Sequence, residues 1–213
     1  MKEDTDKNNL SLFREYVKQL MDYGKKFIIL GNMNAITYKE IFPYIKGDML
    51  WWGHSIHSGD RKFYVPENYP LDAAGCGVDE NGRRFIRVKG VRWFTNVTNK
   101  SRNTPLDLYK RYSNEYPKYD NYDAIEVGKT CDIPMDYNGV MGVPITFLDK
   151  YCPEQFEIIG GFNGYKESDE ANGLLCGTPT EYIDKNGKVK TWTGPTINKK
   201  TCYYRLLIRK RNA

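Results

Sequence analysis

Long apolar runs, paired cysteines and histidines are scarce in this sequence of 213 residues. No hydrophobic stretch approaches the roughly 20 residues that a membrane span requires. The polar start, residues 1–9, does not resemble a signal peptide. The five cysteines are odd in number and include no C-x-x-C pair, which argues against a disulfide framework or a structural zinc site. We therefore expect a cytoplasmic protein that does not contact a membrane.

Histidine is too rare for a convincing metal site. His54, His57 and Asp60 have a spacing that a metal could use, and Cys76 follows downstream. These residues lie in a Gly/Ser-rich loop and are joined by no further histidine, so we expect no bound metal. Cys76, between two glycines, has no evident base beside it and is interpreted as a turn residue rather than a nucleophile.

Aromatic residues and clustered cations are abundant. Aromatics make up 14% of the chain, with 17 tyrosines, and the formal net charge is +5. A single stretch between the turn at Gly82 and the strand around Trp93 carries five cations and no acid. These cations are Arg83, Arg84, Arg87, Lys89 and Arg92. The cluster is a candidate DNA contact, although a solvated basic face explains the charge pattern equally well.

The first 52 residues alternate between helical and strand patterns. Apolar side chains along residues 11–23 form one helical stripe that Gly24 would end. The continuous apolar run Phe27–Leu30 predicts a strand buried on both faces, as in a parallel sheet. A capping-box pattern at residues 37–40 predicts a helix through Ile45, and residues 49–52 predict another strand. The fold class is therefore α/β.

Beyond Gly53 the predicted strands become short and are separated by turns. Asp79–Gly82 predicts a turn before a strand at residues 83–88, and Asn186–Gly187 predicts a β-hairpin. Residues 203–209 predict a last strand. Some helix is expected between Pro105 and Tyr112. A glycine-rich turn that would cradle a cofactor is missing upstream of the first strand. Either the later antiparallel strands complete the sheet, or the chain is a fragment.

Several long blocks of the sequence resemble one known family. They include residues 11–16 (SLFREY), 25–32 (KKFIILGN), 36–40, 116–125, 132–148 (DIPMDYNGVMGVPITFL) and 153–160. These blocks are similar to those of the EcoRI-type adenine-specific DNA methyltransferases, and the resemblance spans roughly Leu10 to Arg211. It implies a family that transfers a methyl group from S-adenosylmethionine to the exocyclic amine of adenine in duplex DNA, after flipping the base out of the helix.

The resemblance also shows what is missing. The family's catalytic Asn-Pro-Pro-Phe motif would precede Ser11, but this position reads Lys7-Asn8-Asn9-Leu10. No catalytic residue is therefore carried over. We expect a truncated or split enzyme, inactive alone, that pairs with duplex DNA and with a separately encoded cofactor-binding half. The alternative is a DNA-binding module without catalysis, or a decayed remnant.

The resemblance implies three regions: a degenerate leader (1–10), the second half of a Rossmann-like methyltransferase sheet (11–97), and a loop- and hairpin-rich DNA target-recognition region (98–213). Asn32 and Asn34 follow the first strand directly and are candidates to line a base or cofactor pocket. Asparagines that favour turn geometry are the other interpretation of these two residues. The cluster from Arg83 to Arg92 and the Tyr-rich stretch to Tyr122 would face DNA.

Overall fold

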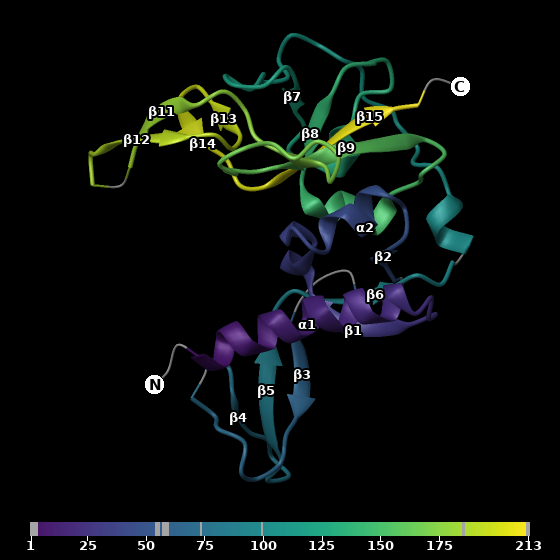
Figure 1. The fold of residues 1–213 in the computed structure, drawn as a ribbon, viewed down its shortest axis with the longest axis vertical. Helices are drawn as coiled ribbons and strands as arrows, with labels where there is room; N and C mark the ends of the chain where they lie inside the picture. The colour runs from purple at the N-terminus through teal and green to yellow at the C-terminus, as the bar shows by residue number, and fades with distance from the viewer. Residues whose placement is uncertain are drawn as a thin grey trace.

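Two main β-sheets organise the chain, with helical segments between them (Figure 1). The computed structural model describes residues 4–53, 56, 60–72, 74–98, 100–184 and 186–211. The fold mixes α and β structure, as expected, but helices are few. The described part holds two α-helices, α1 (Asp4–Asp22) and α2 (Phe42–Lys46), and four 3-10 helices: η1 (Met33–Thr37), η2 (Lys100–Asn103), η3 (Thr130–Asp132) and η4 (Ile145–Lys150).

Helix α1 packs one side against a three-stranded sheet. The sheet has the order β1-β6-β2 and consists of β1 (Ile28–Asn32), β2 (Trp51–Trp52) and β6 (Val91–Thr95). Phe13 of α1 meets Phe94 edge-on at 5.2 Å and lies directly over Gly31, where a Cβ atom would collide with its ring. Gly24 follows α1 with a φ of 59°, which confirms the predicted helix end.

Strand β1 forms where a strand was expected, but its surroundings differ from the prediction. It pairs antiparallel with β6, with Ile29 opposite Phe94, and lies at the edge of the sheet rather than inside a parallel one. Ile28 is 61% exposed and Leu30 is 41% exposed. The prediction of burial on both faces was therefore wrong, because α1 covers only the face that carries Ile29 and Gly31.

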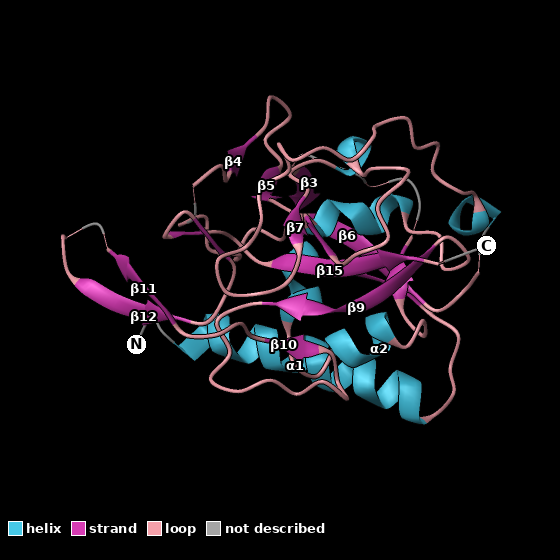
Figure 2. Ribbon diagram, turned by 90° about the horizontal axis from the view of Figure 1, so that it is seen from above, coloured by secondary structure: helices cyan, strands magenta, loops and turns pink. Residues whose placement is uncertain are grey.

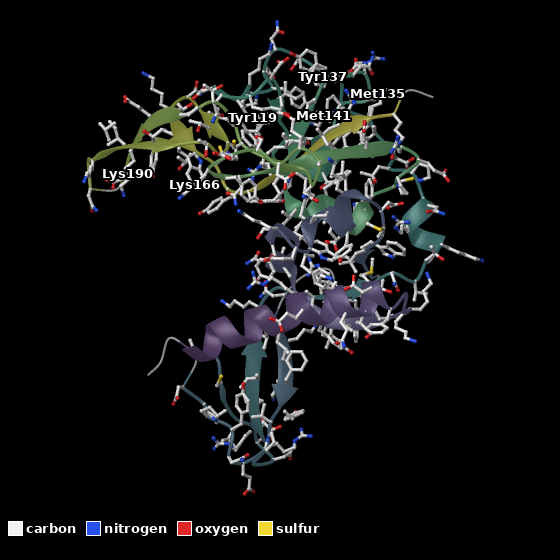
Figure 3. All side chains as sticks on the ribbon, in the orientation of Figure 1. Tyr119, Met135, Tyr137, Met141, Lys166 and Lys190 are labelled. Atoms are coloured by element: carbon white, nitrogen blue, oxygen red, sulfur yellow. The ribbon has the colours of Figure 1, made fainter. Side chains whose placement is uncertain are left out.

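A five-stranded sheet forms the core of the second half of the chain. Its order is β10-β9-β15-β8-β7, with β7 (Ile125–Glu126), β8 (Met141–Val143), β9 (Phe156–Phe162), β10 (Leu174–Leu175) and β15 (Arg205–Lys210). The predicted last strand, β15, lies in its centre. Glu126 forms a bidentate ion pair with Arg205 and accepts a hydrogen bond from Tyr119. Figure 3 labels Met141, which belongs to this sheet, and Tyr119, whose ring packs against Gly142 of β8.

Helix α2 and its flanking turns join the two sheets. Phe42 and Ile45 are buried in a hydrophobic cluster that also contains Val17 of α1 and Ile158 of β9. The predicted capping box does not form. Ile41 occupies the N-cap and Pro43 stands in the first turn, so the helix starts four residues later than expected. The helix expected between Pro105 and Tyr112 is absent from these described residues, which run as extended loop.

Two groups of strands project from this body (Figure 1), and the β11–β12 hairpin also extends from it in Figure 2. The first, called the finger, has the order β3-β5-β4 with β3 (Arg61–Tyr64), β4 (Gly77–Val78) and β5 (Arg84–Val88). The second consists of the hairpin β11 (Thr180–Ile183) and β12 (Val189–Trp192) and the hairpin β13 (Thr196–Ile197) and β14 (Lys200–Thr201). The Asn186–Gly187 hairpin prediction is confirmed. None of the described helices is long and apolar enough to cross a membrane.

Candidate nucleic-acid interface

Cations and aromatic rings alternate on one face of the finger. Lys62 pairs with Arg87 across β3 and β5, and Tyr64 pairs with Phe85. Because side chains alternate between the faces of a strand, these four residues share one face. The result is a surface on which each cation lies next to an aromatic ring.

The rings hold the cations by cation–π contacts. The ammonium of Lys62 lies 4.0 Å from the ring centre of Phe85, and the guanidinium of Arg83 lies 4.1 Å from that of Tyr64. Arg87 approaches Phe85 from further away, at 5.9 Å. Such contacts orient a cation without neutralising its charge, so it remains available to an anion.

Asp79 fixes Arg83 at the tip of the finger. Its carboxylate accepts hydrogen bonds from the backbone N–H groups of Arg83 and Asn81, and from Nε of Arg83 at 3.0 Å. Led by the backbone N–H of Arg83, these bonds lower the pKa of Asp79 to about 2. Asp79 is therefore charged at neutral pH and offsets part of the positive charge of Arg83 and of Lys62, whose Nζ lies 3.8 Å away.

The other residues of the basic cluster differ in how strongly neighbouring groups of the protein already engage their charges. Arg84 donates to the carbonyl of Tyr69 at 2.8 Å. Arg87 and Lys89 are exposed, and neither forms an ion pair with another described residue. Arg87 and Lys89 are thus the two members of the cluster whose charge is least engaged within the described protein.

Arg92 differs from the other four candidate DNA contacts because its side chain is buried. It belongs to β6, its side chain is only 2% exposed, and its Nη2 lies 3.3 Å from Oδ2 of Asp149. Its guanidinium also lies 4.9 Å from the ring centre of Trp52. A residue enclosed in this way cannot reach a phosphate, so the structure corrects the expectation for Arg92 and removes it from the candidate interface.

Asn32 is the last residue of β1, and Asn34 lies in η1, which follows directly. The side-chain oxygen of Asn32 accepts the N–H of Asn34 at 2.9 Å and caps η1, while its amide nitrogen donates to the carbonyl of Lys89 at 3.3 Å. The Asn32 side chain thus ties the end of β1 to the β5–β6 turn. This supports the turn interpretation for Asn32. Asn34 is exposed beside it.

Sequence reasoning missed Lys62, Tyr64 and Phe85 as members of this surface. The two cations and two aromatic residues at 61–64 were a usable signal, but only the β3–β5 register shows which of these side chains share a face with Arg87. His54 and His57, weighed as metal ligands, lie outside the described residues. Within the described part, no group of three or more His, Cys, Asp or Glu side chains could hold a metal ion.

An α/β chain with a projecting, cation-rich β-sheet is typical of a nucleic-acid-binding protein. Comparison with known proteins narrows this class. A family model for the adenine-specific methyltransferase EcoRI matches residues 6–211, and the chain belongs to this family.

Three relatives are enzymes named Type II methyltransferases. The chain is 51% identical to M.EcoRI of Escherichia coli over 169 residues, covering 78% of this chain and 52% of the relative. It is 35% identical to M.MgeORF184P of Mycoplasma genitalium over 209 residues, covering 94% and 62%. It is 41% identical to M.MpnI of Mycoplasma pneumoniae over 154 residues, covering 70% and 48%. The chain thus spans about half to three-fifths of the relatives it matches. No solved structure matches it.

Proposed function

We propose that this chain is the duplex-binding part of an adenine-specific DNA methyltransferase, and that a cofactor-binding segment adjoining β1 completes the enzyme. The observation that carries the DNA-binding proposal is the face of the finger on which Lys62, Arg87, Tyr64 and Phe85 alternate. Membership of the family supplies the reaction: transfer of a methyl group from S-adenosylmethionine to the amine of adenine.

Asn32, a candidate pocket residue, does not present a free side chain to S-adenosylmethionine. The carboxyl end of β1, where an α/β sheet would place a ligand, leads into Asn32. The side chain of Asn32 is already bonded on both sides, by Asn34 and by Lys89. The sequence also contains no Asn-Pro-Pro-Phe motif. We therefore assign the cofactor and the catalytic motif to the adjoining segment and derive no chemical step from this chain alone.

The free edge of β1 is where that segment would join. Within the described part of the chain, β1 pairs with β6 alone, and its outer edge is open. Ile28 and Leu30 are exposed beside this edge, on the face opposite α1. An open strand edge flanked by apolar side chains is a template for another strand. A strand added to β1 would cover the edge, and the structure around it would cover Ile28 and Leu30.

DNA binding is tested by measuring the affinity for a labelled duplex over a range of salt concentrations. Each phosphate that a cation neutralises contributes about 0.9 to the slope of log affinity against log salt. We expect the double variant Arg87→Ala, Lys89→Ala to lower the slope by about 1.8. The matched control is Arg87→Lys, Lys89→Arg, which preserves the charge and should preserve the slope. A slope unchanged in the alanine variant would remove the finger from the interface.

A further inference from the structure

A second basic surface lies on the opposite projection of the molecule, at the turn between β13 and β14. Asn198 and Lys199 both adopt positive φ values, 50° and 60°. A two-residue hairpin turn of this kind favours glycine, because a side chain is strained in the left-handed region. Here the second central position carries a lysine, and its side chain is exposed.

Asp120 holds this turn in place. Its carboxylate accepts the backbone N–H of Asn198 at 3.1 Å and that of Lys199 at 2.7 Å. Two hydrogen bonds to a charged acceptor offset the strain of two left-handed residues. The turn therefore presents Lys199 and its neighbour Lys200 from a fixed backbone.

The neighbouring hairpin supplies an apolar wall opposite these lysines. Ile183 pairs with Val189 at the end of the β11–β12 ladder, so both side chains share a face. They are 71% and 58% exposed. Together with Asn198, Lys199 and Lys200 they line an open cleft of about 540 Å³.

The base of this hairpin is firmly anchored. Trp192 packs against Gly164 and Gly194, leaving no room for a Cβ atom at either glycine. The amide of Asn121 donates to the carbonyls of Gly194 and Thr178. Figures 1 and 3 show the hairpin, with Lys190 upon it, extending well away from the five-stranded sheet. Its apolar tip thus projects on a rigid support.

The charges of the cleft favour an anionic ligand. Asp184 is neutralised by Lys190, whose Nζ lies 2.7 Å from its carboxylate. Lys199 and Lys200 form no ion pair with any other described residue. Of the residues that line the cleft, Glu181 alone is acidic. One wall is therefore cationic, and the other carries Ile183 and Val189 together with Glu181.

We propose that this cleft is a second DNA contact, in which Lys199 and Lys200 bind backbone phosphates while Ile183 and Val189 pack against deoxyribose or base edges. Exposed apolar side chains next to lysines match the alternation of sugar and phosphate along a strand. The inference rests on the proposed function, because it assigns the cleft to the same duplex that the finger binds. The cleft and the finger occupy different projections of the molecule, so their contributions to binding should be close to additive.

The first test uses Lys199→Gly combined with Lys200→Ala in the full chain. We expect the salt slope of duplex binding to fall by about 1.8, the loss of two phosphate contacts. Glycine relieves the strain at position 199, so the melting temperature of Lys199→Gly alone should match or exceed that of the wild type. Lys25→Ala, at an exposed site shortly after the end of α1, is the control and should leave the slope unchanged.

The second test replaces both apolar residues, with Ile183→Ser and Val189→Ser. Duplex affinity should fall several-fold at every salt concentration, with an unchanged slope, because no phosphate contact is lost. Suppose that the Lys199→Gly, Lys200→Ala variant keeps the wild-type salt slope, while the Arg87→Ala, Lys89→Ala variant lowers it. The cleft then does not bind DNA, and the proposed function stands. The inference would also be overturned if the cleft variants lost affinity for an acidic peptide but kept their affinity for the duplex. If neither set of variants changes the slope, the proposed function itself fails.

Discussion

Arg92 of β6 forms a buried ion pair with Asp149 of η4, with 3.3 Å between Nη2 and Oδ2. The pair connects the three-stranded sheet to the second half of the chain, more than fifty residues further along. It also shows that two arginines of the same basic stretch of sequence have different roles. Arg92 serves the fold, while Arg87, five residues earlier, stays exposed on the finger.

Replacing these two arginines should therefore change the stability by very different amounts. Arg92→Ala removes the buried cation that pairs with the partly buried carboxylate of Asp149 and should lower the free energy of unfolding by about 3 kcal/mol. Arg87→Ala should change it by less than about 0.5 kcal/mol, as is usual at an exposed site. Denaturation by urea measures both. Equal destabilisation by the two variants would show that the burial of Arg92 has no energetic consequence.

The acid stability of the finger should depend on Asp79. Its pKa is lowered to about 2, so its contribution to stability is fully present above the unfolded pKa of about 3.9. That contribution is lost as the pH falls from about 4 to about 2. Asp79→Asn should be less stable at neutral pH and should lose the part of the acid dependence that Asp79 supplies. An NMR titration that finds an ordinary pKa for Asp79 would contradict this account.

The exposed edge of β1 should control both solubility and assembly. Ile28→Lys with Leu30→Lys places two charges next to the open edge, which should reduce aggregation of the chain. The same variant should no longer be stabilised by a separately expressed cofactor-binding segment from a full-length relative. Met49→Lys, at an exposed site outside this strand, is the control. Thermal unfolding with and without the segment measures the effect. A variant that is stabilised as well as the wild type would show that the segment does not dock at β1.

Local signals in the sequence predicted local structure well. The stripe of α1 and its end at Gly24 follow from side-chain periodicity and from the left-handed conformation that glycine accepts. The Asn186–Gly187 turn predicted its hairpin for the same reason. The surroundings of β1 could not be predicted, because an apolar run reports hydrophobicity and not which strand pairs with it. Only the exposed fraction of Ile28, 61%, shows that this side chain faces outward.

The candidate interface was likewise predicted in part. The charge pattern predicted the basic stretch but could not separate Arg87 from Arg92, since burial depends on contacts with distant residues such as Asp149 and Trp52. Lys62 and Tyr64 belong to this surface because the register between β3 and β5 places them beside Arg87 and Phe85. The β13–β14 turn escaped notice because Asn198-Lys199 lacks the glycine that usually announces such a turn.

Transfer of tritium-labelled methyl groups to duplex DNA tests the central claim most directly. The chain, the cofactor-binding segment of a relative, and an equimolar mixture of the two are each incubated with labelled S-adenosylmethionine. We predict label in the adenine fraction from the mixture and none above background from either part alone. Label from the chain alone would contradict the assignment of cofactor and catalytic motif to the adjoining segment. An inactive mixture of two folded, associated parts would contradict the proposal that they form one enzyme.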